Sequence, residues 1–403
     1  MTYCLRTLTL ALGIVACTGS FTRGQQYQDR PDIEKAIQKL AEKNDTVAKA
    51  SKMKDGDGKV VETESDLGAR NLWLLQIGNG ANRANILVTG TQHAAEWVAY
   101  RTVLTAATFI LENKTEATLP NEARFRYFRQ FKDMNIEKLL ANANIYMVPL
   151  VNPSGYDYSR ANPNQFWRKN RRELTQVSDP WPAAGNRFPD VADPRPGVTL
   201  YGVDLNRNFP SANWGTVTRN PADNSITTSN IPSQHTYFGR RVKEKETQAI
   251  VALTTRDRRF DLHIDVHSFS GTVGWVEQVD GTRANLRPDG GFNDDKVFPV
   301  IGEAASALII DPTLRSRYFP QGTPYPTSGD TLQWQYEAND KKCLGMLIEV
   351  GKENPRAANV LENFHPTNAT AHANAVLPGE LFMMFAAVDR SFSAKPKAEF
   401  RKP

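Results

Sequence analysis

The sequence has little cysteine and little net charge, and both shortages limit the kinds of protein it can encode. Its 403 residues include three cysteines, Cys4, Cys17 and Cys343, of which the first two lie in an apolar N-terminal stretch. A disulfide-stapled scaffold is therefore excluded, and stability must come from a large hydrophobic core. The net charge of +5 is small for this length and argues against a dedicated nucleic-acid-binding protein.

The sequence also lacks an apolar run that we would expect to cross a membrane. Near the N-terminus, Arg6 precedes a short, mostly apolar run at residues 8–16, which is typical of a secretory signal peptide. We expect residues 1–24 to be this signal and residues 27–395 to form one domain, exported to the periplasm or the extracellular space. The stretch ending at Cys17 also resembles a lipoprotein signal, so a lipid anchor there is the alternative.

Strand-like and helix-like segments alternate along the chain, which predicts an α/β fold. Apolar or alternating patterns predict strands at 58–66, 71–78, 84–90, 143–153, 260–269 and 343–351. Helical spacing predicts helices at 31–50, 97–113, 240–255, 293–309 and 373–389, with long loops over 173–232. We expect a single domain built on a mixed, mostly parallel, twisted sheet that helices cover on both faces.

A histidine and a glutamate stand three positions apart in "GTQHAAEW", directly after the strand expected at 84–90. Residues three apart on a helical turn project to one side, and α/β sheets place their sites at the carboxyl ends of strands. His93 and Glu96 are therefore candidate metal ligands. The alternative is a helix-start glutamate beside a purely structural histidine.

A zinc site needs at least a third protein ligand, and "HIDVHSF" offers His263 and His267. On a strand their backbones are about 13 Å apart, so the two histidines cannot bind one ion. His267 ends the strand and is the better candidate, whereas His263 is expected to be structural. The remaining histidines are expected at the surface or in capping positions: His235, His365 and His372.

Further motifs accompany these candidate ligands. In sequence and in order, the chain resembles zinc carboxypeptidases of the carboxypeptidase A family in "VNPSGYDYSR", "FWRKNRR", "GVDLNRNF", "HSFS", "YPTSGDT" and "LIEVG". The resemblance extends from about Trp73 to Gly351. It implies a hydrolase with one Zn²⁺ per chain that removes C-terminal residues from peptides or proteins, and we expect a monomer.

The resemblance also implies roles for individual residues. Zinc ligands fall on His93, Glu96 and His267, the catalytic carboxylate falls on Glu349, and Asp204 would accept a hydrogen bond from His93. The arginine that polarises the scissile carbonyl falls on Arg168, the pair that holds the terminal carboxylate falls on Asn206 and Arg207, and the mobile tyrosine falls on Tyr325. Arginine suits a carboxylate clamp because its planar fork binds both oxygens.

Arg168 belongs to a cluster of basic residues, "RKNRR", that could be mistaken for a nucleic-acid-binding patch. The cluster lacks the stacking aromatics and wide basic field that such a patch needs. We expect Lys169, Arg171 and Arg172 to be solvated or paired with loop carboxylates.

The segment after the mobile tyrosine builds part of the pocket for the C-terminal side chain in this family. Where members that cut after Lys or Arg carry an acidic residue, this chain has Leu332, which predicts a preference for hydrophobic C-terminal residues. Asp330 is the complication, because it could receive a basic residue if it turned into the pocket. Its loop context favours a solvent-facing or loop-bracing role.

Two other functions remain open. The chain could hydrolyse other amide-linked acids, such as peptidoglycan stem peptides or acylated amino acids. It could also be a catalytically silent binding protein, although such a protein would usually lack Glu349 or a ligand. Ala95 stands where pancreatic members carry an arginine that aids subsite binding, so contacts upstream of the scissile bond differ from theirs.

Overall fold

The structure is a computed structural model of the whole chain. It describes residues 27–78, 83–112, 135–175, 199–254, 258–276, 278–279, 282–283, 294–322, 325–339, 343–357 and 359–388. The expected signal at 1–24, with Cys17, and the end of the expected 27–395 domain lie outside the described residues.

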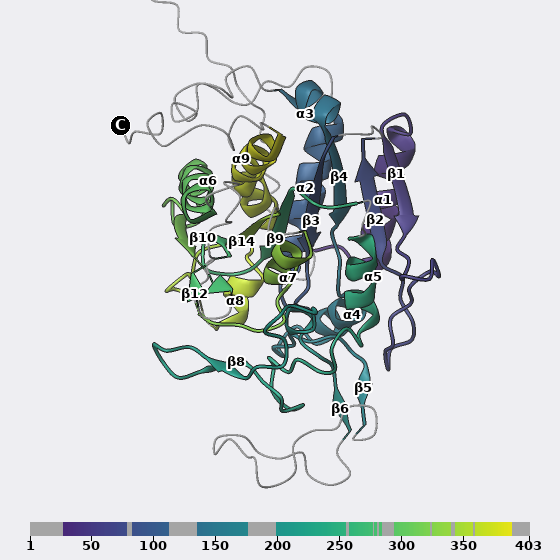
Figure 1. Cartoon of the computed structure of the whole chain (residues 1–403), viewed down its shortest axis with the longest axis vertical. Helices are drawn as coiled ribbons and strands as arrows, with labels where there is room; N and C mark the ends of the chain where they lie inside the picture. Colours follow the sequence, from purple (N-terminus) through teal and green to yellow (C-terminus); the bar gives the residue numbers. More distant parts are fainter. Residues whose placement is uncertain are drawn as a thin grey trace, which may run out of the picture.

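An eight-stranded sheet runs through the centre of the molecule (Figure 1), in the order β1-β2-β4-β3-β9-β14-β10-β13. Its strands are β1 (Ala48–Lys52), β2 (Trp73–Ile77), β3 (Ala84–Gly90), β4 (Ala143–Val148), β9 (Leu262–His267), β10 (Thr272–Trp275), β13 (Phe319–Gly322) and β14 (Leu344–Glu349). The four central strands, β4, β3, β9 and β14, are mutually parallel, and the antiparallel pairs lie toward the edges. The predicted mixed, mostly parallel sheet is confirmed.

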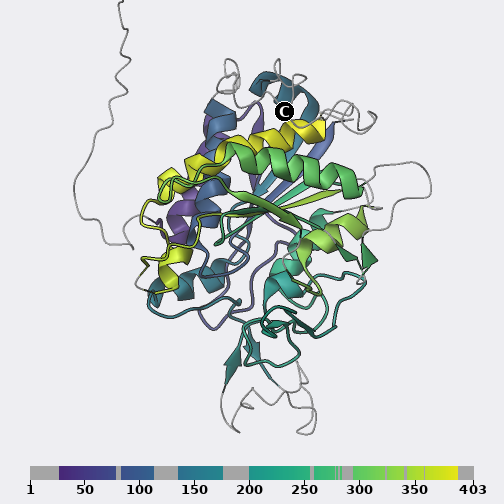
Figure 2. The ribbon, with the colours of Figure 1, turned by 90° about the vertical axis from the view of Figure 1, so that its left-hand side faces the viewer.

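Helices cover both faces of this sheet. One face carries α2 (Trp97–Glu112), α6 (Asp294–Leu308) and α9 (Ala369–Val388), and Figure 2 shows α6 in green and α9 in yellow side by side across it. The other face carries α5 (Lys245–Leu253) and α7 (Thr331–Ala338). Side chains alternate along a strand, so Ile86 and Val88 of β3 pack into the hydrophobic core beneath α2, α6 and α9. Leu87 points to the opposite face and packs into the core beneath α5 and α7.

Shorter elements complete the fold. In the described part of the chain, the other helices are α1 (Arg30–Lys43), α3 (Ile136–Asn142), α4 (Pro153–Ala161), α8 (Leu361–Phe364) and the 3-10 turn η3 (Leu205–Arg207). Among the described residues, three two-stranded antiparallel sheets pair β5 (Glu173–Leu174) with β6 (Leu200–Tyr201), β7 (Thr218–Arg219) with β8 (Ile226–Thr228), and β11 (Gln278–Val279) with β12 (Thr282–Arg283).

The close packing of β3 against α2 requires a glycine at the end of the strand. A Cβ on Gly90 would lie 2.9 Å from a methyl group of Val103 and 3.0 Å from the carbonyl oxygens of Ala99 and Pro149. The next residue, Thr91, takes a positive φ of 52°. The chain therefore turns sharply at the carboxyl end of β3 and carries the following residues back over the sheet edge.

Two local predictions were wrong, and one strand was missed. The helix expected at 31–50 ends at Lys43, and Asn44 caps it by donating its side-chain amide to the Leu40 carbonyl. The sequence of β1, "AKASK", has no strand pattern, because β1 is an edge strand fixed by pairing with β2. Residues 58–66 form only isolated bridges instead of a strand.

Helix α7 was not predicted, because Thr, Ser, Gly and Pro precede it and made the region look like a loop. Its start carries a capping pattern, however: the Asp330 carboxylate accepts a hydrogen bond from the Gln333 backbone N–H at 2.9 Å. A glutamine three residues after an aspartate would have indicated this helix.

One helix contradicts the expectation that no segment could cross a membrane. By length and composition alone, α9 is long and apolar enough to do so. Most of α9 is buried against α2 and α6, as is typical of a core helix.

Candidate active site

The carboxyl ends of three neighbouring strands bring the candidate site residues together. His93 and Glu96 lie on the turn after β3, His267 ends β9 and Glu349 ends β14. In the register of the parallel pair, Glu349 lies directly beside His267. These residues are far apart in the sequence, and the sheet order places them at one edge.

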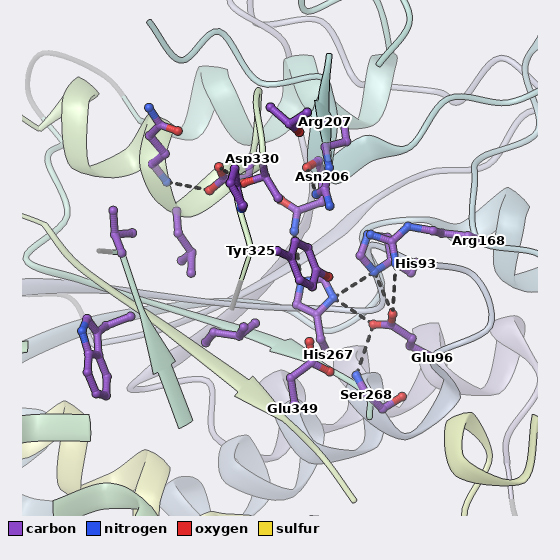
Figure 3. A pocket seen from close by; sticks show the side chains of 18 of the residues that line it. His93, Glu96, Arg168, Asn206, Arg207, His267, Ser268, Tyr325, Asp330 and Glu349 are labelled. Carbon is purple, nitrogen blue, oxygen red and sulfur yellow. Dashed lines mark hydrogen bonds and ion pairs between the residues drawn. The ribbon is translucent and has the colours of Figure 1, made fainter. Parts of the chain in front are cut away.

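The three candidate ligands converge on one point (Figure 3). The carboxylate oxygens of Glu96 lie 2.8 Å from Nδ1 of His93 and 2.8 Å from Nδ1 of His267, and the two Nδ1 atoms are 3.0 Å apart. One ligand atom from each residue lies within 4.8 Å of the others, and all three side chains are buried. Two imidazoles and one carboxylate are the donor set of a catalytic zinc site, with a coordination position left for water. These residues therefore fit a zinc ion.

The Glu96 carboxylate is ionised in this setting. Burial alone would raise its pKa, but His93 and His267 together lower that pKa to about 2. A ligand that keeps its charge well below neutral pH is ready to bind a cation.

Each histidine turns its other ring nitrogen toward a buried aspartate. Nε2 of His93 lies 3.2 Å from Oδ1 of Asp204, and Nε2 of His267 lies 2.8 Å from Oδ2 of Asp265. Sequence reasoning overlooked Asp265. Residues two apart on a strand share a face, so the pattern Asp-x-His at 265–267 could have revealed it.

Glu349 opens onto the pocket beside Glu96 and His267, while protein encloses the rest of its carboxyl group. This desolvation, together with the negative charge of Glu96, raises the pKa of Glu349 to about 8. A cation bound nearby would lower this value toward the neutral range, where a general base is most effective.

Arg168 reaches the ligands from the loop that follows α4. Its Nε donates to Oδ2 of Asp204 at 2.8 Å, and its Nη1 lies 3.8 Å from Oε1 of Glu96. Burial opposes its positive charge, but the Asp204 and Glu96 carboxylates hold the pKa of Arg168 above its usual value. The guanidinium is therefore a fixed positive charge at the edge of the ligand cluster.

The other basic residues of this loop are buried, so of the two expected alternatives the solvated one was wrong and pairing with carboxylates is confirmed for Arg171 and Arg172. Arg171 pairs with Asp66, and Arg172 donates to Glu244 at 2.7 Å. Lys169 donates to the Pro232 carbonyl at 2.7 Å, and burial lowers its pKa to about 7. These side chains anchor the loop that presents Arg168.

Asn206 and Arg207 come from η3, across the pocket from Glu349. Arg207 is buried, with Nε donating to the Thr227 carbonyl at 2.7 Å and Nη1 to the Asn206 carbonyl at 2.6 Å. Asn206 accepts the Thr331 backbone N–H at 2.8 Å, and Tyr325 lines the same pocket. The guanidinium has further N–H groups beyond these two bonds. Because Arg207 lines the pocket, these groups can donate hydrogen bonds to a molecule bound there.

A cavity of about 800 Å³ joins all these groups. Leu332, Val276 and Leu347 supply apolar lining, and Leu332 is 8% exposed. Asp330 also lines the cavity, but its Oδ1 accepts the Gln333 backbone N–H and its Oδ2 accepts the Thr327 hydroxyl at 3.0 Å. Both oxygens of Asp330 therefore brace the start of α7.

The remaining histidines lie away from the ligands. His263 is buried and bonds the Thr89 hydroxyl at 2.7 Å, and His235 is exposed. The capping expectation is confirmed for His365, which is the C-cap of α8, although its ring is buried and stacks on Trp97 with 3.5 Å between the ring centroids. The surface or capping expectation was wrong for His372, which is 3% exposed within α9. Aromatic stacking and helix packing bury these two rings, and neither effect has a local sequence pattern.

Comparisons with known proteins agree with this geometry. A family model described as zinc carboxypeptidase matches residues 59–371. Mouse carboxypeptidase A4 is 26% identical over 64% of this chain and 49% of its own length, and human mast cell carboxypeptidase A is 27% identical over 70% and 58%. The chain thus spans about half the length of these curated relatives.

The fold also matches a solved structure. Carboxypeptidase A from Helicoverpa armigera aligns with a TM-score of 0.63 at 20% identity, covering 93% of this chain and 78% of that one. At this identity the match shows the fold alone.

Proposed function

The chain belongs to the zinc carboxypeptidase family, and on that premise we propose that it is a metallocarboxypeptidase that hydrolyses the last peptide bond of a substrate. One observation carries the proposal: a single cavity joins the His93, Glu96 and His267 cluster to the Arg207 guanidinium and to Glu349. A site for the metal, a site for a carboxylate and a general base are the parts that such a reaction requires.

The Arg207 fork and the Asn206 amide would hold the substrate's terminal carboxylate. Arg207 is preorganised for this role because its bonds to two backbone carbonyls fix the guanidinium plane. A clamp for a free carboxylate beside the ligand cluster restricts cleavage to the last peptide bond and makes the enzyme an exopeptidase.

A zinc ion bound by His93, Glu96 and His267 would supply Lewis acidity, which polarises a carbonyl and makes water nucleophilic near neutral pH. Glu349 would take a proton from the attacking water and pass it to the leaving amine. Arg168 would donate hydrogen bonds to the scissile carbonyl oxygen as negative charge develops on it. Tyr325 would close over the bound C-terminal residue.

We infer a preference for hydrophobic C-terminal residues. Leu332, Val276 and Leu347 offer apolar surface, and each methylene buried there would contribute about 1 kcal/mol of discrimination. Asp330 is already engaged in capping α7, which disfavours a basic residue in this pocket. The intact ligand set, base and clamp argue against a silent binding protein.

The test is hydrolysis of blocked dipeptides that end in Phe, Leu, Lys or Glu, with and without a chelator. We expect Phe and Leu substrates to have the highest kcat/KM, chelation to abolish turnover and zinc to restore it. Turnover unaffected by chelation would refute the zinc mechanism. Preferred cleavage of a Lys substrate would refute the pocket assignment. If the protein cleaved none of the four dipeptides but did cleave peptidoglycan stem peptides or acyl amino acids, it would instead be a hydrolase of other amide-linked acids.

A further inference from the structure

A buried aspartate beneath the ligand cluster has no role in the reaction described above. Asp265 lies on β9, two residues before His267, and is fully buried. A carboxylate removed from water is costly unless hydrogen bonds satisfy it. Asp265 has three such partners: one is a candidate metal ligand, and the other two belong to the segment that carries another ligand.

The first partner is His267 itself. Its Nε2 lies 2.8 Å from Oδ2 of Asp265, and its Nδ1 faces Glu96 and His93. A carboxylate only accepts hydrogen bonds, so Nε2 must carry a ring hydrogen, which leaves Nδ1 as the nitrogen that can bind a metal once any proton on it is displaced. Asn206 Nδ2 is 3.4 Å from the same Nε2, but with that nitrogen protonated the contact is no hydrogen bond.

The other partners belong to the segment that carries His93. Gln92, next to His93 in the chain, donates its amide to Oδ2 of Asp265 at 2.6 Å. Thr89, on β3 opposite Asp265 in the strand register, donates its hydroxyl to Oδ1 at 2.7 Å. One carboxylate therefore joins the strand that ends in His267 to the turn that holds His93.

The hydrogen-bond network around Asp265 extends through Thr89 to His263. The Thr89 hydroxyl has a single hydrogen, which Asp265 accepts, so Thr89 must accept a hydrogen bond from Nε2 of His263 at 2.7 Å. This arrangement places a ring hydrogen of His263 on Nε2, and it explains a histidine that lies close to the site without being able to reach the ion.

We propose that Asp265 is a positioning residue for the metal site: it fixes the tautomer and orientation of His267 and ties that ligand to the turn bearing His93. The proposal rests on zinc binding by His93, Glu96 and His267. Asp204 makes the equivalent contact to His93, so each imidazole ligand has its own buried carboxylate. Such outer partners are worth roughly 10–100-fold in metal affinity.

The experiment measures zinc affinity by competition with a chromogenic chelator at pH 7 and records the visible spectrum of the Co²⁺-substituted protein. For Asp265→Asn we expect a zinc Kd roughly 10–100-fold weaker than that of the parent and a shifted cobalt spectrum, because the amide can present a donor to Nε2. Glu380→Gln is the matched control. Glu380 is a fully buried carboxyl on α9 with no contact to the ligands, so this variant should keep the parent's Kd and spectrum.

Thr89→Val removes one donor to Asp265 without changing the shape of the side chain, and it carries the test if Asp265→Asn does not fold. We expect a smaller loss of zinc affinity than for Asp265→Asn, and no further loss when the two changes are combined. A parent-like Kd and cobalt spectrum in both single variants, with only thermal stability reduced, would overturn the proposal. If the parent itself bound no zinc, the proposed function would fail first.

Discussion

Replacing Arg207 by alanine removes the group that we expect to distinguish a free C-terminus from an internal peptide. The side chain is buried, and two of its N–H groups already donate to the Thr227 and Asn206 carbonyls. Two charge-assisted bonds to a substrate carboxylate contribute about 1.5–3 kcal/mol each, or about 3–6 kcal/mol together. At about 1.4 kcal/mol per factor of ten, kcat/KM for a free-acid substrate should fall by roughly 10²–10⁴.

The assay compares a blocked dipeptide that ends in a free carboxylate with its C-terminal amide. The parent should strongly prefer the free acid, and Arg207→Ala should erase most of that preference because the amide never used the clamp. Arg207→Lys keeps the charge but loses the planar fork, so an intermediate preference is expected. An unchanged ratio of free-acid to amide kcat/KM in Arg207→Ala, with zinc content and folding intact, would refute the assignment.

A control must separate this effect from loss of stability, because the substitution also leaves two backbone carbonyls without a donor. Arg241 serves this purpose: it donates to the Pro210 carbonyl at 2.8 Å, is exposed and does not line the cavity. Arg241→Ala should keep the parent's preference for the free acid. Thermal unfolding of all three variants shows whether any change in the ratio follows stability instead.

Two further predictions concern the metal and the base. Glu349→Gln should lower kcat by roughly 10²–10⁴ while zinc affinity stays close to that of the parent, because the residue acts in the transition state and is not a ligand; parent-like turnover would exclude Glu349 as the base. Burial lowers the pKa of His267, but the Asp265 and Glu96 carboxylates outweigh burial and raise that pKa well above its usual value. At neutral pH zinc must therefore displace a proton from the His267 ring. Zinc affinity should therefore improve about tenfold per pH unit below that pKa, and calorimetry in buffers of different ionisation enthalpy should detect released protons; binding that releases none would contradict this.

The sequence predicted the central architecture because the parallel strands are buried on both faces and appear as apolar runs. It failed at β1, an edge strand whose conformation is fixed by its partner β2. The candidate ligands His93, Glu96 and His267 followed from patterns at the ends of β3 and β9, whereas Glu349 and the other site residues followed from the resemblance to zinc carboxypeptidases. Asp265 escaped notice because its role depends on Thr89 and Gln92, which only the pairing of β3 with β9 brings close.

The charges around the ligand cluster explain how substrate binding could prepare the base. Asp204, Asp265 and Glu96 are ionised carboxylates, and Arg168 and Arg207 are fixed cations. With a zinc dication bound, these groups alone leave one excess positive charge, which ionisation of Glu349 neutralises. The carboxylate of a bound substrate would neutralise the same excess positive charge. Because buried sites disfavour uncompensated charge, a bound substrate then favours the protonated form of Glu349.

Substrate binding should therefore make proton uptake by Glu349 more favourable at the moment when the attacking water must lose a proton. Added negative charge raises the pKa of a nearby carboxyl group, because it disfavours the ionised form. We expect the acidic limb of the kcat profile, which reports the substrate complex, to have a higher apparent pKa than that of the kcat/KM profile, which reports the free enzyme. Both limbs should vanish in Glu349→Gln, and a lower pKa in the complex would show that the carboxylate of the substrate does not act on the base.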